Sequence, residues 1–398
     1  MEPSSLAPFC YPDEICGARF SPFSHMARPK LIIASSEANA DMLYASGFRA
    51  PDAFTFLEVE GKSHLLLSDL EVDRGRAEAK VDVVDAYSEF EKIASRTSSK
   101  RPSFPKVVKA WLVAKMVNKV EVPSDFPLGL AKELKALGLS LKASKGVFFP
   151  EREIKSLAEI EAMEAATRIA EAGMNRGLQI LRDARIQKDN TLSHRRTQLT
   201  SELLRLEMET AVLQAGGVAR GDTIVACGEH ACDPHARGTG PLFANQLIIL
   251  DIFPRDARSG YHGDLTRTVV RGKASEAQRH MWETCLTGQK MAIKSMKPGV
   301  EGGPVHDKIK QFFAASGYPT EIINGRWQGF FHGTGHGLGL EVHESPRFGS
   351  TTFFPGQVIT VEPGIYMPGL GGVRHEDVAL IRKSGVKLLT QIPKPFEI

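Results

Sequence analysis

The spacing of hydrophobic and polar residues changes near residue 150 of the chain. Before that point, short apolar runs bounded by polar residues predict strands. The first is "KLIIAS", and the next two lie in "AFTFLEVEGKSHLLLSDLE", where Glu60-Gly61-Lys62 marks the turn of a hairpin. After Pro150, apolar residues recur at helical spacing and predict a long amphipathic helix; they are Leu157, Ile160, Met163, Ala166 and Ile169. The change predicts a domain boundary between residues 146 and 155.

Three later apolar segments each contain or adjoin an acidic residue. "LIILDIF" contains Asp251, "VITVEPG" contains Glu362, and "GVRHEDVALI" places Glu376 directly ahead of an apolar run. Such runs are typical of buried strands. A carboxylate is costly to bury unless it is paired or coordinates a metal. The three placements therefore indicate one shared centre.

The overall composition excludes several classes of protein. With 398 residues and 42% hydrophobic content, the chain can bury a large core and is expected to form two domains. Its formal charge of +3 and the lack of basic runs interleaved with aromatics predict no nucleic-acid partner. No apolar run is long enough to span a bilayer, so no membrane partner is expected.

The N-terminus and the cysteines predict a cytoplasmic location. Residues 1–26 are rich in Pro and Ser and are expected to be loose, without the basic start and apolar run of a secretory signal. Five cysteines are an odd number and do not resemble a disulfide framework. The cluster "CGEHAC" lacks a second ligand pair at zinc-finger spacing, so it is interpreted as a loop with ordinary thiols.

The segment "HGTGHGLGLEVHE" holds three of the twelve histidines, with glycines between them that let the main chain approach closely. Combined with the acids in apolar or Gly-rich settings, it defines a candidate ligand set: Asp251, Asp264 in "GYHGDLTRT", His336, Glu362 and Glu376. Four carboxylates and one imidazole suit hard or borderline divalent ions such as Mn. This set exceeds what one ion needs, and it predicts two ions about 3.5–4 Å apart that activate a water for hydrolysis.

The order of these residues resembles a known superfamily. Embedded in "GYHGDLTRT", "HGTGHGLGLEVHE", "FPGQVITVEPGIY" and "GVRHED", the order Asp, Asp, His, Glu, Glu is similar to that of the pita-bread metallopeptidases, which include prolidase, Xaa-Pro aminopeptidase and methionine aminopeptidase. The resemblance spans roughly residues 155–390. "ANADMLYASGF" and the strand-like segments after it resemble the smaller creatinase-type domain that precedes the catalytic domain in proline-directed members.

The resemblance implies an α+β fold. A creatinase-like mixed α/β domain is expected over residues 27–150 and a pita-bread catalytic domain over 151–398. It also implies two divalent ions per chain, with Mn preferred and Co or Zn possible, and a homodimer. The implied metal ligands are Asp251, Asp264, His336, Glu362 and Glu376.

The resemblance also assigns roles around the metals. Glu362 would take a proton from the bridging water. His235, in "CDPHARG", matches a histidine that steadies the oxyanion or shuttles a proton, and His343 matches one that contacts the scissile peptide. His332 would line the proline pocket. Tyr366 and Arg374 would orient ligands.

One interval departs from the family pattern. "DIFPRDARSGYHGD", from Asp251 to Asp264, is longer than usual and lacks the glycine common after the first Asp. An insertion at a hairpin tip would be harmless. A register shift would instead make Asp256 the rival of Asp251, although Asp256 lies in a polar stretch. His262 and His375 are interpreted as ordinary histidines.

The expected function is metal-dependent hydrolysis of the Xaa-Pro bond at the N-terminus of peptides. The residues of "GHGLGLEVHESP" resemble the matching segment of short bacterial and archaeal prolidases, and this favours Xaa-Pro dipeptides as substrates. The free carboxylate of a dipeptide would need a cation such as Arg374 or a basic residue of a second subunit. The alternatives are an Xaa-Pro aminopeptidase, a metal-free creatinase-like enzyme, a non-catalytic scaffold and methionine aminopeptidase. The complete ligand set argues against the creatinase-like enzyme and the scaffold, and the N-terminal domain argues against methionine aminopeptidase.

Overall fold

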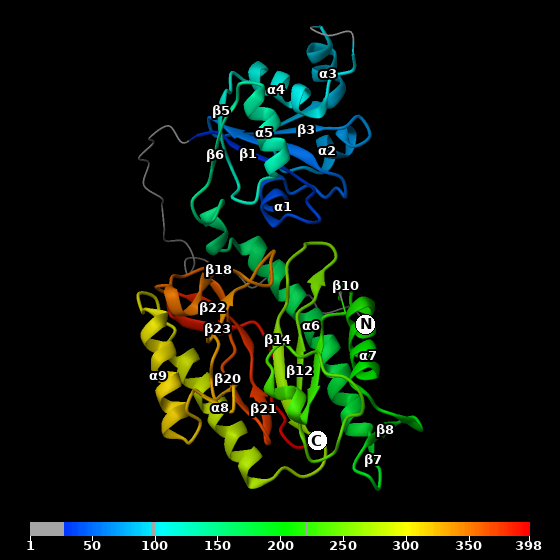
Figure 1. Cartoon of the computed structure of the whole chain (residues 1–398), viewed down its shortest axis with the longest axis vertical. Coiled ribbons are helices and arrows are strands. Elements are labelled where there is room, and N and C mark those ends of the chain that lie inside the picture. The colour runs from blue at the N-terminus through cyan, green and yellow to red at the C-terminus, as the bar shows by residue number, and fades with distance from the viewer. Residues whose placement is uncertain (1–27, 97–99, 220) are drawn as a thin grey trace, which may run out of the picture. The chain divides into compact units, whose positions relative to one another are not determined.

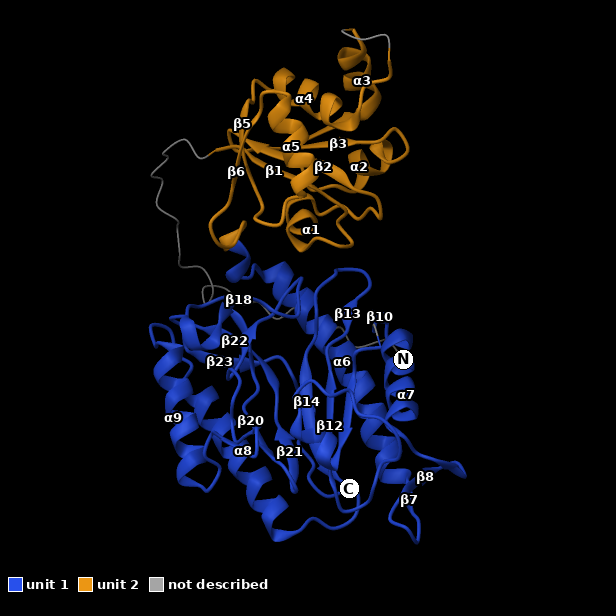
Figure 2. Cartoon of the chain, in the orientation of Figure 1, with its two compact units in different colours: residues 1–18, 151–398 blue, residues 19–150 orange. Residues whose placement is uncertain are grey.

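A computed structural model describes residues 28–96, 100–219 and 221–398. These residues form two compact units that divide between Pro150 and Glu151 and are coloured separately in Figure 2. The segment expected to be loose, residues 1–26, lies outside the described residues. Among the helices that are described, none is both long and apolar enough to cross a bilayer.

The N-terminal unit is built on a six-stranded sheet. Its strands are β1 (Lys30–Ala34), β2 (Phe54–Val59), β3 (Lys62–Leu67), β4 (Val83–Ala86), β5 (Lys119–Val122) and β6 (Ser140–Ala143). Their order is β4-β3-β2-β1-β5-β6. The predicted hairpin is confirmed, because β2 and β3 pair antiparallel, and Glu60 and Gly61 at the turn have φ angles of 51° and 74°. Two left-handed residues in such a turn match the twist of the paired strands.

Helices cover both faces of this sheet. They are α1 (Ala40–Ser46), α2 (Val72–Glu78), α3 (Tyr87–Ser95), α4 (Phe104–Ala114) and α5 (Leu128–Ala136). Successive residues of a strand point to opposite faces. Leu31 and Ile33 of β1 therefore pack in one core cluster with Trp111 of α4, while Ile32 packs in another with Met42 of α1. The unit has the mixed α/β character expected from the sequence.

The second unit opens with the predicted long helix, α6 (Leu157–Asp183), after a short 3₁₀ turn, η1 (Pro150–Glu153). A capping box fixes the start of α6: the Ser156 side chain accepts a hydrogen bond from the Glu159 N–H, and the Glu159 carboxylate accepts one from the Ser156 N–H. The predicted apolar face is buried from Ile160 onward, whereas Leu157 is 52% exposed. The helical period was predicted correctly, and core packing begins one turn later.

The remaining elements of this unit alternate between helices and short strands. The helices are α7 (Ser201–Gln214), α8 (Glu276–Ser295) and α9 (Gly302–Ala315), with 3₁₀ turns η2 (Gly228–Cys232) and η3 (Phe348–Ser350). The strands are β7 (Arg185–Ile186), β8 (Leu192–His194), β9 (Thr197–Gln198), β10 (Gly217–Val218), β11 (Ile224–Cys227), β12 (Leu247–Ile252), β13 (Arg255–Asp256), β14 (Leu265–Val270), β15 (Glu321–Ile323), β16 (Arg326–Gln328), β17 (His336–Gly337), β18 (Glu344–Arg347), β19 (Val358–Val361), β20 (Gly364–Met367), β21 (Gly371–Arg374), β22 (Asp377–Arg382) and β23 (Gly385–Leu388).

Two antiparallel sheets form the inner layer of the second unit. One has the order β11-β12-β14, and the other has the order β18-β17-β19-β22-β23. Helices α6 and α7 share a core cluster with β11 and β12, while α8 and α9 share a second cluster with β19, β21 and β22. Figure 1 shows α8 and α9 on one side of the strands and α7 on the other. Helices packed on antiparallel sheets confirm the expected α+β class.

Candidate metal centre

The hairpin of β12 and β14 places two acids on one face. Asp251 pairs with Thr266 and Ile252 pairs with Leu265, so Asp264 lies just before the first paired residue of β14. Residues two apart in a strand share a face, and diagonal neighbours across an antiparallel pair remain within side-chain reach. Asp251 and Asp264 therefore point to the same side of the sheet.

The long interval between these acids forms an outgrowth at the hairpin tip. Its short strand β13 pairs with β10, and Gly217 is opposite Asp256. The Asp256 carboxylate accepts hydrogen bonds from the backbone N–H groups of Arg258 and Ser259 and from the Ser259 hydroxyl. These bonds close the turn and hold the pKa of Asp256 below its usual range, although burial alone would raise it. Asp256 is occupied in the turn, which leaves Asp251 as the first acid of the centre.

The second sheet supplies the other three residues. His336 begins β17, Glu362 follows β19, and Glu376 lies between β21 and β22. The His336 Nε2 atom lies 3.2 Å from Glu362 Oε1 and 3.8 Å from Asp264 Oδ2. Asp264, His336 and Glu376 each offer a ligand atom, and these atoms all lie within 4.8 Å of one another. The five predicted ligands are thus brought together from both sheets.

Glycine allows this close approach around His336. A Cβ atom at Gly335 would lie 1.8 Å from the Thr360 carbonyl oxygen, and one at Gly337 would lie 2.5 Å from the Ser345 carbonyl oxygen. Only a residue without a side chain fits at either position. The glycine spacing of the histidine-rich segment therefore has a packing cause, because it lets β17 lie against its neighbours.

The electrostatics of the cluster favour bound cations. Burial and mutual repulsion raise the pKa of Asp264 and of Glu376 well above the usual range. Burial also raises the pKa of Asp251, although Arg374 opposes it, and the buried Asp251 Oδ1 atom has no hydrogen-bond partner among the described residues. Carboxylates crowded in this way are stable when they coordinate metal. The residues present fit a divalent metal centre.

His336 and Glu362 form a pair with opposite shifts. Burial alone would raise the pKa of Glu362, but its hydrogen bond with His336 lowers that pKa to about 2. Burial alone would lower the pKa of His336, but Glu362 raises it to about 9. These opposite shifts favour an ion pair of a protonated His336 with an ionised Glu362 when no metal is bound. A metal ligand must be a neutral imidazole, so metal binding would release this proton.

Arg374 and Tyr366 hold Asp251 in place. The Arg374 guanidinium donates to Asp251 Oδ2 at 2.5 Å, to the Tyr366 hydroxyl at 2.9 Å and to the Thr266 hydroxyl at 3.4 Å. Arg374 is 3% exposed and Tyr366 is fully buried. Thr266 also donates to Glu376 Oε2 at 2.8 Å. This network fixes two acids at once, and it supports the orienting role expected for Arg374 and Tyr366.

Three further histidines surround the cluster without belonging to it. The His332 Nε2 atom lies 2.9 Å from the Tyr366 hydroxyl, and burial lowers the pKa of His332 to about 4. The His343 ring packs edge-on against His336 with centroids 4.3 Å apart. His235 is exposed, and its charge contributes to lowering the pKa of both His332 and His343. All three therefore lie near the four acids and the His336 imidazole.

The thiols of the "CGEHAC" cluster fit their ordinary interpretation, whereas His375 fits only in being a core residue, because both of its ring nitrogens are buried without a hydrogen-bond partner among the described residues. His375 is fully buried against Trp282, with ring centroids 4.7 Å apart. The thiols of Cys227 and Cys232 are free, and burial raises the pKa of each to about 11. Thiols held in the protonated form are poor metal ligands.

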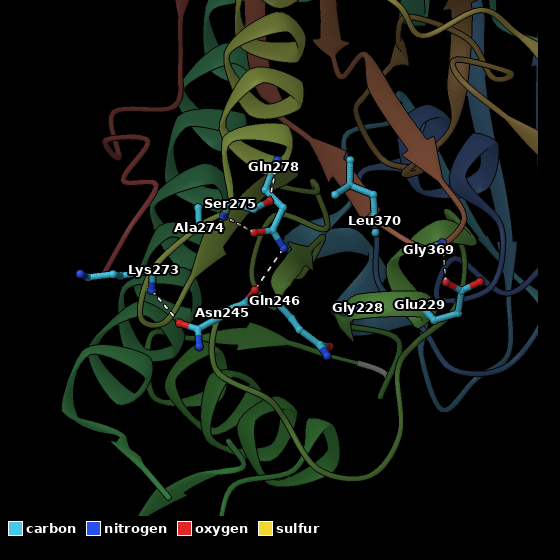
Figure 3. Close-up of a pocket in the computed structure, with 11 residues that line it drawn as sticks. Gly228, Glu229, Asn245, Gln246, Lys273, Ala274, Ser275, Gln278, Gly369 and Leu370 are labelled. Carbon is cyan, nitrogen blue, oxygen red and sulfur yellow. Dashed lines mark hydrogen bonds between the residues drawn. The ribbon is translucent and has the colours of Figure 1, made fainter. Parts of the chain in front are cut away.

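Two hollows in this unit differ in their relation to the cluster. One of about 110 Å³ is lined by Phe253, His262 and Val342, each within two residues of Asp251, Asp264 or His343. The other, of about 780 Å³, is shown in Figure 3 and includes Asn245 and Lys273. It lies at the start of β12, whereas Asp251 is near the end of that strand, roughly 16 Å away at the rise of an extended chain. Of these two hollows, the smaller is lined by residues closer in sequence to the candidate ligands.

The sequence reasoning missed the threonines that support the ligands. Thr266 bonds to Glu376, and Thr360 donates to Glu362 Oε1 at 3.4 Å and accepts from the His336 N–H at 3.1 Å. A signal was present in the sequence. Each threonine lies on a strand two residues from a ligand, and such residues share a face.

Comparisons with known proteins agree with this geometry. The model of metallopeptidase family M24 matches residues 161–383. The Xaa-Pro dipeptidase of Pyrococcus horikoshii is 30% identical over 360 residues, which cover 89% of this chain and 91% of that protein. The crystal structure of the prolidase from Pyrococcus horikoshii OT3 is similar with a TM-score of 0.73 and 27% identity, covering 92% of this chain and 95% of that one.

A more distant structure shows the same fold. The X-Pro aminopeptidase of Thermotoga maritima is 23% identical, with a TM-score of 0.77 over 94% of this chain and 98% of that chain. The resemblance inferred from the motifs is therefore confirmed, as is the pita-bread fold. On these matches, the chain belongs to metallopeptidase family M24.

Proposed function

We propose that the protein is an Xaa-Pro dipeptidase, a prolidase, that works with two divalent metal ions. The observation that carries this proposal is the cluster of Asp251, Asp264, His336, Glu362 and Glu376, of which all but Glu362 are buried and whose charge is balanced only in part by Arg374. The Xaa-Pro dipeptidase of Pyrococcus horikoshii, which is similar along most of its length, supports the choice of substrate. The oxygen-rich ligand set favours Mn, with Co and Zn as the alternatives.

The five residues would hold the metals in the space between the two sheets. When bound, a pair of such ions lowers the pKa of a shared water and polarises the carbonyl that this water attacks. Glu362 would accept the proton of that water. Its carboxylate faces His336 at 3.2 Å and is partly exposed, whereas Asp264 and Glu376 are almost fully buried. This difference in access supports Glu362 as the proton acceptor.

The surrounding histidines would bind the substrate. His343 is exposed beside His336, where it could contact the scissile peptide, and His235 lies close enough to influence His343. His332 lies against the rings of Phe330 and Tyr366, with centroids 5.1 Å and 5.4 Å away. An aromatic wall of this kind suits the ring of proline.

The contacts of Arg374 bear on how a dipeptide would be recognised. Its guanidinium is buried and already bonded to Asp251 and Tyr366, so its geometry favours orienting Asp251 over binding the free carboxylate of a substrate. The carboxylate would then need another cation, and a basic residue of a second subunit remains the proposed source. The homodimer and the cytoplasmic location stay predictions.

The test compares substrates on metal-loaded protein. Metal-free protein is supplied with Mn, Co or Zn, and cleavage of Ala-Pro, Ala-Pro-Ala-Ala and C-terminally amidated Ala-Pro is measured at equal concentration. We expect fastest cleavage of Ala-Pro and binding of two metal equivalents. Equal or faster cleavage of the tetrapeptide would make the protein an Xaa-Pro aminopeptidase. Cleavage with no bound metal, or no cleavage of any Xaa-Pro peptide, would contradict the proposal.

A further inference from the structure

A buried ion cluster lies next to the candidate catalytic residue His343. Glu344 is 8% exposed, and its two carboxylate oxygens face two different cations. The Lys155 ammonium donates to Glu344 Oε1 at 2.5 Å, and the Arg152 guanidinium donates to Glu344 Oε2 at 2.6 Å. Arg152 also reaches Glu341 Oε2 at 2.9 Å. None of these residues belongs to the predicted metal centre.

The cations come from a distant part of the chain. Arg152 lies in η1, and Lys155 lies just before α6, whereas Glu344 opens β18. The Lys155 N–H donates to the Gly356 carbonyl at 2.8 Å, and its ammonium also donates to the Arg152 carbonyl. The connecting segment between η1 and α6 is thereby fixed on the sheet that carries His336. These hydrogen bonds hold Lys155 beside Arg152 and Gly356.

The Glu344 carboxylate organises the loop that carries His343. The Glu341 N–H donates to Glu344 Oε2 at 3.3 Å, and the Gly339 N–H donates to the Glu341 carbonyl at 3.1 Å. A Cβ atom at Gly339 would lie only 2.4 Å from Glu344 Oε1, so the loop wraps closely around the carboxylate. The loop between Gly337 and Glu344 contains no regular strand or helix. Its first residues are also held by backbone bonds, because the Leu338 N–H donates to the Val358 carbonyl at 3.2 Å and the Gly339 carbonyl accepts from the His262 N–H at 2.8 Å.

The imidazole of His343 has little else to fix it. Among the described residues, no hydrogen bond to its ring is present, and its ring contact is the one with His336. Its side chain is exposed. Its position is therefore set by its backbone, and that backbone is anchored one residue later by Glu344.

We propose that the Glu344–Lys155–Arg152 ion cluster is a positioning device that holds His343 against the substrate side of the metal centre. This inference rests on the proposed function, because it assigns His343 a catalytic role. A buried ion cluster is poor evidence of stability alone, since well-packed apolar residues are often as stabilising. Charged groups instead fix geometry, because their hydrogen bonds are directional. Here they fix the geometry of the loop that precedes Glu344.

The test is a double-mutant cycle on the full-length, metal-loaded protein with Ala-Pro as substrate. The variants are Glu344→Gln, His343→Ala and the two combined. We expect Glu344→Gln to lower kcat by about tenfold, because a misplaced catalytic group costs up to about a hundredfold, while KM and metal content change little. In the His343→Ala background, we expect Glu344→Gln to have almost no further effect on kcat, since neighbours that act as a unit are not additive.

A matched control and a second variant keep the test decisive. Lys387→Met breaks the ion pair of Lys387 with Glu164, which measures 2.6 Å in the same unit, and should leave kcat unchanged. Lys155→Met removes one cation and keeps Arg152, so it reports on the cluster where Glu344→Gln does not fold. Equal loss of kcat from Glu344→Gln with and without His343 would overturn the inference. Absence of Xaa-Pro cleavage by the unsubstituted protein would instead reject the proposed function.

Discussion

At the scale of single residues, the four carboxylates of the cluster do not share one environment. Glu362 is paired with His336 and has a pKa of about 2, whereas burial and repulsion raise the pKa of Asp264 and Glu376. Glu362 is also the most accessible of the three. Glu362 is thus the carboxylate of the set that is held ionised and accessible, and its role as proton acceptor is a proposal that its variants test.

Replacing Glu362 with Gln should distinguish a specific role of this carboxylate from the general effect of losing a negative charge. The amide keeps an oxygen but removes the charge and the proton acceptor, so we expect weaker metal binding and turnover lower by about a hundredfold or more. Metal titration calorimetry and kcat for Ala-Pro provide the measurements. Glu207→Gln, on the surface of α7, serves as the control for losing a carboxylate. Near-normal turnover of the Glu362 variant would show that its role is misassigned.

The histidines outside the ligand set should behave differently. The family resemblance places His235 and His343 around the reacting carbonyl and not on the metals, so alanine at either position should leave bound metal nearly unchanged. Loss of an acid–base or oxyanion partner typically costs about a hundredfold or more in rate. Elemental analysis and kcat test this together. Metal loss in both variants would place these histidines among the ligands.

At the scale of elements, different parts of the β12–β14 hairpin carry the candidate ligands and close the turn at its tip. The paired strands carry Asp251 and lead to Asp264, while the tip is closed by Asp256. Asp256→Ala removes three hydrogen bonds and should destabilise the protein by about 1–2 kcal/mol, as loss of a capping side chain does. Metal stoichiometry should stay at the unsubstituted value. Asp251→Asn, by contrast, should lose metal. If elemental analysis instead finds metal loss in Asp256→Ala and not in Asp251→Asn, Asp256 is the ligand and the β12–β14 register is wrong.

The same hairpin shows what a sequence can and cannot predict. The strand around Asp251 was predictable because an acid inside an apolar run is a local signal, and α6 was predictable from its spacing. For the interval around Asp256, the sequence allows either an insertion at the hairpin tip or a register shift. The choice depends on the pairing of β13 with β10, which no local pattern indicates. The cluster of Lys155 with Glu344 joins residues 189 positions apart, and no local pattern indicates such a contact. Distant residues were predicted to meet only at the candidate ligands, whose acids and histidine lie in segments that resemble a known family.

At the scale of the whole molecule, the catalytic unit folds around an excess of negative charge. Two sheets with separate cores meet at a cluster whose ionised acids repel one another. A carboxyl group whose pKa is raised by folding destabilises the folded state at pH values above that pKa. The penalty disappears as the pH falls through the folded pKa toward the ordinary value of about 4.3 for Glu. Stability and metal binding are therefore coupled.

Glu376→Gln should expose this coupling. Without metal at pH 8, the variant should be more stable than the unsubstituted protein, because it removes one repelling charge and keeps an oxygen to accept from Thr266. Each 1 kcal/mol gained should raise the thermal midpoint by roughly 2–4 °C. The difference should shrink as the pH is lowered, since the unsubstituted carboxyl then becomes protonated, while groups common to both proteins cancel. With Mn added at pH 8, the order should reverse, because the variant has lost an anionic ligand.

Scanning calorimetry of both proteins, with and without Mn, makes the comparison. A metal-free variant that is less stable at every pH would mean that Glu376 is held by favourable contacts and that the cluster carries no excess charge for a cation to balance.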